Sequence, residues 1–149
     1  MMKSFSQRDP LWRDLLIKGT NLPIGRWGCT LTCVADLSTY FGDNLTPAEI
    51  NATLNFTPSG LLIWASASFA HFTFARREYG RNDDNISHAI ADPLSAVLLQ
   101  VAGGSHWVVA CERYPNNGIY KIADPWLGDW ASMERYGNDI TGAAYFKRV

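Results

Sequence analysis

Apolar residues recur at helical spacing in the first third of the chain. From Gly28 onward they follow one another at intervals of three and four residues, at Leu31, Val34, Leu37 and Phe41. Gly42 comes directly after this series, at a position where glycine commonly ends a helix. We therefore predict a helix over residues 28–42.

A second helix is predicted by its cap. In "TPAEI", Thr46 can accept a hydrogen bond from the N–H of Glu49, and the Glu49 side chain can reach back to the Thr46 N–H. Pro47 suits the first helical position, because the N–H that it lacks would have no helical partner there. This helix should end near Leu54.

Two other stretches contain apolar residues without so clear a period. We predict a short helix in "DPLWRDLLIK", ending near Gly19, and another in "SGLLIWASASFAHF", starting after Gly60.

The second half of the chain changes to short β-branched and aromatic runs separated by turn residues, at 96–101, 106–114, 118–124 and 142–149. The turn "PNNG" makes the middle two runs an antiparallel hairpin. Helices followed by strands indicate an α+β domain with N-terminal helices packed on a C-terminal antiparallel sheet. No repeat or linker divides the sequence, so residues 1–149 are predicted to form a single domain.

Composition narrows the possible partners. The chain has 47% hydrophobic residues, six tryptophans and a formal net charge of −1, with no basic block for a nucleic acid to bind. No apolar stretch approaches the roughly 20 residues that a membrane helix needs. The N-terminus lacks the apolar core of a signal peptide, and three cysteines cannot all pair. We therefore expect a reduced protein in the cytoplasm where it is synthesised, with no membrane span.

Cys29 is the first candidate for chemistry. It lies at the start of the predicted helix, where unpaired N–H groups and the helix dipole favour a thiolate, and Gly28 before it permits close backbone approach. Cys33 lies one helical turn later, on the face that also carries Leu37 and Phe41 and that we expect to pack in the core. Three other roles for Cys29 are weighed: a small core residue, half of a disulfide with Cys33, and a zinc ligand together with Cys33 and His106. A disulfide with Cys33 does not suit the geometry of a regular helix, and the zinc site lacks a fourth ligand.

A nucleophilic thiol needs a base, and the base needs an orienting group. His106 opens a predicted strand after a Gly-rich turn, whereas His71 and His88 are interpreted as packing or surface residues. Asp124 ends the partner strand of the predicted hairpin, so it should meet His106 at the same edge of the sheet. There it can hold the imidazole in one tautomer, although an Asp-Pro turn is its ordinary alternative.

Taken together, these motifs resemble papain-like cysteine peptidases. The order of "SQRDPLW", "IGRWGCTLTCVADLSTYFG", "LTPAEINATLN", "GLLIW", "SHWVVACE" and "IADPWLG" is similar to that of the bacteriocin-processing (double-glycine leader) peptidase-like family, including its small stand-alone members from bacteria and phages. The resemblance implies a papain-like fold with four catalytic positions: Cys29 as nucleophile, His106 as base and acid, Asp124 as the orienting residue and Gln7 in the oxyanion hole. The segment "GCTLTC" departs from the Cys-Gly-Pro-Ala-type helix start that is usual there.

The resemblance implies a cysteine peptidase that hydrolyses a peptide or isopeptide bond without a metal or cofactor. Its expected substrates are a peptide, a protein or a peptidoglycan peptide, and a phage-encoded protein would act in the virion or the host cell. Three alternatives stay open: an inactive papain-like binding or scaffold module, an acyltransferase or transglutaminase-like enzyme, and a peptidoglycan stem-peptide endopeptidase.

Several tryptophans are expected near the cleft, on the flanks of Cys29, His106 and Asp124, among the five at Trp27, Trp64, Trp107, Trp126 and Trp130. Exposed tryptophans near a cleft can stack on sugar rings or hold apolar peptide side chains. For any one of them, a place in the core is the favoured interpretation.

Overall fold

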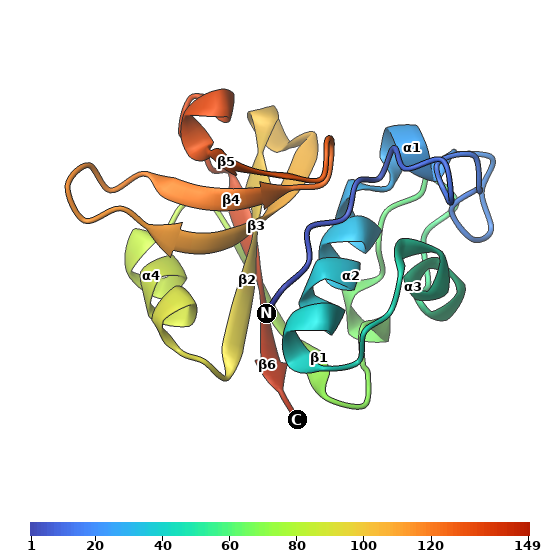
Figure 1. The fold of residues 1–149 in the computed structure, drawn as a ribbon, viewed down its shortest axis with the longest axis horizontal. Helices are drawn as coiled ribbons and strands as arrows, with labels where there is room; N and C mark the ends of the chain where they lie inside the picture. The colour runs from blue at the N-terminus through green and yellow to red at the C-terminus, as the bar shows by residue number, and fades with distance from the viewer.

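The computed structural model describes all residues from Met1 to Val149. Six strands form one antiparallel sheet in the order β1-β6-β2-β3-β4-β5, and helices cover both of its faces (Figure 1). The three N-terminal helices lie on one side of the sheet and α4 lies on the other (Figure 1). The chain is therefore a mixed α+β fold, as the sequence predicted.

Four α-helices and six strands make up the regular structure. The helices are α1 (Ile24–Trp27), α2 (Cys29–Phe41), α3 (Pro47–Thr53) and α4 (Asp83–Ala91). The strands are β1 (Phe72–Tyr79), β2 (Ser95–Val101), β3 (His106–Arg113), β4 (Tyr120–Asp124), β5 (Asp129–Ser132) and β6 (Gly142–Arg148). The longest helix has 13 residues, and none is long and apolar enough to cross a membrane.

The two helices with clear local signals are confirmed. Gly42 ends α2 in a left-handed conformation with φ of 100°, which glycine adopts without steric cost. Thr46 and Glu49 form the complete capping box at the start of α3, with Pro47 in its first turn. The β3–β4 hairpin and strands β2 and β6 also follow the sequence prediction.

The two other predicted helices are wrong. Residues 10–19 form turns, in which Ile17 N–H donates to Leu22 O across a tight loop. Residues 61–73 run mostly extended around one 3₁₀ turn, Trp64–Ser66, and Ile63 N–H donates to Asn55 O. In both segments, hydrogen bonds to neighbouring loops replace the bonds that a helix would need.

Two apolar clusters lie on opposite faces of the sheet. One contains 20 buried residues and joins α2 and α3 to the sheet, and the other contains 13 and lies beneath α4. Residues alternate between the clusters along β2, where Leu98 faces the first and Leu99 the second, as the pleat of a strand requires. Because α2 packs against β3 through the first cluster, the start of α2 is held beside the start of β3.

Candidate active site

Cys29 is the first residue of α2, and its side chain is partly buried. Helix α1 ends immediately before it, at Gly28. A Cβ built on Gly28 would lie 2.6 Å from Cγ2 and 2.7 Å from the carbonyl oxygen of Ile24. Only glycine fits at this distance, so the absence of a side chain lets α1 turn directly into α2. The expected placement of Cys29 at a helix start is thus observed.

His106 and Asp124 meet at one edge of the sheet. His106 is the first residue of β3 and Asp124 the last residue of β4. The imidazole Nε2 lies 2.8 Å from Asp124 Oδ1, and the Asp124 side chain is fully buried. This bond leaves Nδ1 as the ring nitrogen available to the thiol of Cys29. The hairpin therefore brings the two residues together as the sequence predicted.

Asp124 has three further hydrogen-bond donors. Its Oδ1 accepts a bond from the Trp126 N–H at 3.0 Å, and its Oδ2 accepts bonds from Arg135 Nη1 at 2.9 Å and from the Tyr136 hydroxyl. Arg135 also pairs with Asp129, at 2.8 Å. Four donors in all fix the position of the carboxylate and keep it ionised, although it is buried.

Sequence reasoning missed Arg135 and Tyr136. Both lie in the 3₁₀ turn Met133–Tyr136, which follows β5. No spacing pattern connects this turn with Asp124. Strand β5 ends opposite Lys121, and the turn after it brings Arg135 and Tyr136 back to the carboxylate, so no local signal was available to identify them.

The electrostatics favour a thiolate–imidazolium pair. Burial opposes the charge on His106, but the hydrogen bond to Asp124 and the neighbouring Cys29 outweigh it and raise the His106 pKa to about 9. Burial also opposes ionisation of Cys29, yet interaction with His106, the Trp107 N–H and Thr30 lowers the Cys29 pKa below its ordinary value. The Asp124 pKa lies well below its usual range, because its hydrogen-bond donors overcome the effect of burial. This arrangement therefore favours the thiolate of Cys29 over that of an ordinary cysteine.

The other two cysteines have different surroundings, and all three are free. Cys33 is buried, and its thiol donates to Trp107 O at 3.4 Å. Burial raises the pKa of Cys33 well above its ordinary value and that of Cys111 to about 12. Both thiols therefore stay protonated at neutral pH. No group of three or more His, Cys, Asp or Glu side chains is placed to hold a metal ion.

Gln7 lines the same cavity as Cys29 and His106. Its backbone N–H donates to Pro125 O at 2.7 Å, which ties the N-terminal segment to the turn after β4. The buried side-chain amide makes one long bond, from Nε2 to Gly25 O at 3.4 Å, and Oε1 has no partner. The amide thus borders the same cavity as the thiol and is only weakly engaged by the protein.

The other two histidines lie outside this site. His71 pairs with Asp43 through Nδ1 at 2.5 Å, and its side chain is 55% exposed. His88 lies in the last turn of α4, on the opposite side of the sheet. Neither lines a cavity that contains Cys29.

Two cavities meet at Cys29 and form one cleft. One, of about 320 Å³, contains His106 and Gln7, and the other, of about 450 Å³, extends to Trp64 and Arg77. Both are bordered by Trp27, Cys29 and Ser105. Cys29 therefore borders two adjoining cavities.

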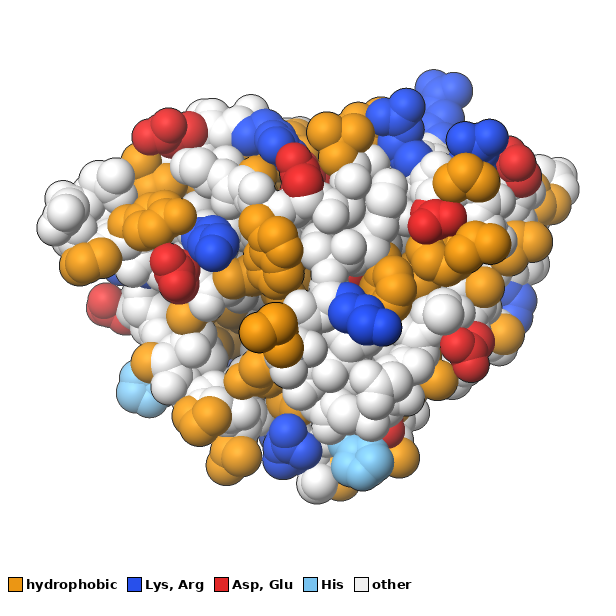
Figure 2. All heavy atoms as spheres, viewed as in Figure 1, with side chains coloured by type: hydrophobic (Ala, Val, Ile, Leu, Met, Phe, Trp, Pro, Cys, Tyr) orange, Lys and Arg blue, Asp and Glu red, His pale blue; other side chains and the backbone are white.

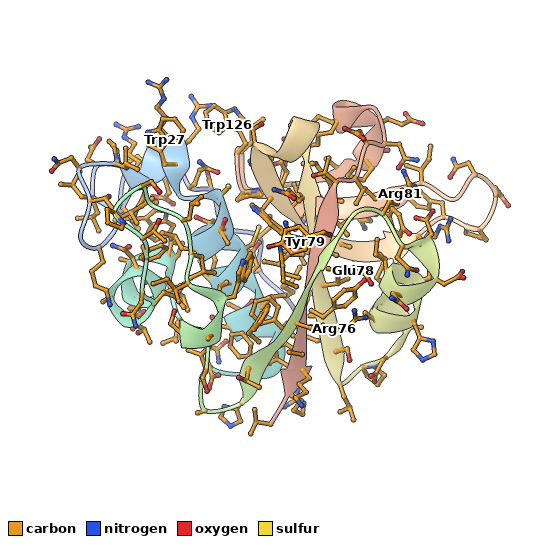
Figure 3. The ribbon with its side chains drawn as sticks, turned by 180° about the vertical axis from the view of Figure 1, so that it is seen from behind. Trp27, Arg76, Glu78, Tyr79, Arg81 and Trp126 are labelled. Carbon is orange, nitrogen blue, oxygen red and sulfur yellow. The ribbon has the colours of Figure 1, made fainter.

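The tryptophans divide between core and surface. Trp107 is buried, and Trp64 packs against it with ring centroids 5.1 Å apart. Trp27, Trp126 and Trp130 are 50%, 40% and 47% exposed. Trp27 in α1 and Trp126 in the turn after β4 lie at the same end of the molecule, at the rim of the first cavity (Figure 3).

Charges near this rim are mainly basic. Arg8, Arg13 and Arg26 line a shallow hollow together with Asp14 and Trp126. Figure 2 shows basic side chains gathered along the upper edge of the molecule, while acidic and basic side chains are interspersed over the rest of that face. On this face, the basic side chains thus gather mainly along one edge (Figure 2).

No family model matches the sequence, and a search of curated proteins finds no matching relative.

Proposed function

We propose that the protein is a cysteine-type hydrolase that cleaves a peptide or isopeptide bond through Cys29, His106 and Asp124. One observation carries this proposal: a helix-start thiol lies against an imidazole whose other nitrogen is held 2.8 Å from a buried carboxylate. The pKa of the thiol is lowered and that of the imidazole is raised, which is the pairing that nucleophilic catalysis by cysteine requires.

The first half of the reaction forms a thioester. The Cys29 thiolate attacks the amide carbon, and the carbonyl oxygen becomes an oxyanion. The Cys29 N–H, at the start of α2, and the Gln7 Nε2 amide are the donors that we assign to this oxyanion. His106 then gives its proton to the departing nitrogen, so the C–N bond breaks and an amine leaves.

The second half restores the enzyme. Neutral His106 removes a proton from water, and the resulting hydroxide attacks the thioester carbon. Collapse of the second oxyanion expels the Cys29 thiolate and releases a carboxylic acid. The cycle as we propose it uses side chains and backbone groups of the chain together with one water molecule.

The resemblance to papain-like peptidases agrees with this assignment. The order Gln7, Cys29, His106 and Asp124 is similar to theirs, and a helix that carries the nucleophile against an antiparallel sheet supports a papain-like fold.

The proposal is tested with the full chain and a library of internally quenched peptides, with products identified by mass spectrometry. We expect cleavage by the wild type and none by Cys29→Ala, with iodoacetamide labelling lost in that variant only. Cys33→Ala and Cys111→Ala serve as matched controls, and both should retain labelling because neither thiol ionises at neutral pH.

Other results would point to other functions. If iodoacetamide modifies Cys111 instead of Cys29, the assignment of the nucleophile is wrong. If labelled peptides bind but are neither cleaved nor transferred to an added amine, the domain is a binding module. Capture of the acyl group by the amine without hydrolysis would identify an acyltransferase.

A further inference from the structure

The cavity on the side of Cys29 away from His106 contains a cation without a counter-ion. Arg77, in the edge strand β1, lines this cavity together with Trp64, Gln100 and Trp107. None of the residues that line it is an aspartate or a glutamate. Arg77 forms no salt bridge within the protein, although other arginines of the chain, such as Arg76 and Arg81, do.

The guanidinium group of Arg77 donates only to neutral acceptors. Nη1 donates to Glu78 O and, at 3.5 Å, to Ala143 O, and Nη2 donates to Gln100 Oε1 at 2.9 Å. The Nε–H has no acceptor in the protein, and Nη2 has a second N–H. An arginine with free N–H groups and no counter-ion is the group that carboxylates bind best, since its planar fork matches their two oxygens.

The surrounding residues hold this guanidinium in place. It lies over the Tyr79 ring at 4.2 Å and over the Trp107 ring at 4.9 Å. Gln100, its side-chain acceptor, is itself held by a bond from Nε2 to Gly104 O at 3.0 Å. A Cβ on Gly142 would lie 2.5 Å from Arg77 Nη1, so a glycine at this position makes room for the group.

The neighbouring carboxylate faces the other way. Glu78 accepts bonds from Asn85, Tyr145 and Arg76, on the α4 side of the sheet. Figure 3 shows Arg76 and Glu78 on that side of β1, and Tyr79 toward the helices that form the cleft. The alternation of side chains along the strand thus separates Arg77 from the nearest acidic residue.

We propose that Arg77 forms a subsite that binds a carboxylate of the substrate, and that it makes the enzyme selective for peptides with an acidic group beyond the bond that is cleaved. This inference rests on the proposed function, because Cys29 borders the same cavity. The carboxylate can be an Asp or Glu side chain or the C-terminal carboxylate of a short peptide. Burial, which lowers the Arg77 pKa, also removes water that would weaken such a contact.

The test compares paired peptides that differ only in charge. Internally quenched peptides are made with Glu or Gln, and with Asp or Asn, at each position in turn, and each with a free or an amidated C-terminus. For the wild type we expect the acidic peptide of one pair to be cleaved with a kcat/KM about tenfold to a hundredfold above that of its amide partner. This factor is the one expected for charge-assisted hydrogen bonds. The peptide pair that shows the preference identifies whether a side-chain or a C-terminal carboxylate binds.

Variants at two adjacent arginines then assign the preference. Arg77→Gln should remove it, and Arg77→Lys should keep part of it, because lysine retains the charge without the planar fork. Arg76→Gln is the matched control and should keep the full preference, since Arg76 faces the α4 side. Thermal unfolding of each variant verifies that it folds, and the ratio of the two rates is independent of the amount of active protein.

The outcomes separate this inference from the function on which it rests. Iodoacetamide labelling of Cys29 together with equal rates for all acidic and amide pairs would overturn the subsite alone. An acidic preference that persists in Arg77→Gln would assign it to another residue. Failure to label Cys29 at all would overturn the hydrolase proposal and the subsite with it.

Discussion

Replacement of Asp124 by asparagine tests the electrostatic basis of the site. The His106 side chain is 13% exposed, and its pKa of about 9 exceeds the ordinary value of 6.5 although burial opposes this rise. At 1.36 kcal/mol per pH unit, the difference stabilises the imidazolium by about 3 kcal/mol. Asparagine can still accept the Nε2 bond but carries no charge, and its NH₂ group would face the Arg135 and Tyr136 donors.

The expected result follows from the sign of these shifts. The thiolate–imidazolium pair exists above the lowered Cys29 pKa and is lost as the pH rises through about 9, where His106 loses its proton. Without the Asp124 charge, the His106 pKa should fall toward 6.5, because Cys29 is then the remaining group that raises it against the effect of burial. At pH 7.5 a His106 pKa of about 9 leaves the imidazole almost fully protonated, whereas a pKa of 6.5 leaves about one tenth of it protonated, so Asp124→Asn should lose about tenfold in kcat/KM.

The assay is the rate of iodoacetamide labelling at Cys29 as a function of pH, measured by mass spectrometry and accompanied by turnover. Asp129→Asn is the control, because Asp129 binds the same Arg135 but does not contact His106. Tyr136→Phe removes one donor to Asp124 and keeps its charge, so its profile should shift only slightly. A wild-type alkaline limb at about 9 that persists in Asp124→Asn would refute the reasoning.

Two further predictions concern the oxyanion hole and the helix start. Gln7→Ala should lower kcat by about 10²–10³-fold, as for loss of one oxyanion donor, while Cys29 labelling by iodoacetamide keeps its rate. An equal fall in labelling would show that Gln7 supports the thiolate instead. Gly28→Ala should lower the free energy of unfolding by about 1–3 kcal/mol in urea denaturation, because the added Cβ meets Ile24 at 2.6 Å. A change below about 0.5 kcal/mol would mean that α1 and α2 can move apart freely.

Elements with strong local signals were predicted well. The capping box of α3 and the C-terminal glycine of α2 satisfy backbone groups within a few residues, so the sequence alone specifies them. Strand β1 was missed because Arg76, Arg77 and Glu78 interrupt its apolar pattern, and as an edge strand it needs only partial burial. Helix α4 was missed because only Ile86 and Ala89 of its nine residues are buried, and strand β5 because it has only four residues.

The residues of the site also fall into those that the sequence predicted and those that only the structure revealed. The turn "PNNG" was enough to predict that His106 and Asp124 meet, because an antiparallel hairpin places the start of one strand beside the end of the next. The approach of Cys29 to this pair depends on the packing of α2 against β3, which no local pattern describes. The residues that hold Asp124, and the Arg77 guanidinium in the cleft, were found only in the structure.

The sequence by itself determined the α+β composition, the cysteine at a helix start and the hairpin that pairs the histidine with the aspartate. These depend on capping, periodicity and turn residues, whose hydrogen bonds and contacts span a few positions of the chain. The tertiary structure alone decided the cleft, the four donors around Asp124 and the unpaired charge of Arg77. Those depend on which distant segments share a buried space, because the donors and charges gathered there shift the pKa values of the site against the effect of burial, and no acidic residue lines the cavity of Arg77.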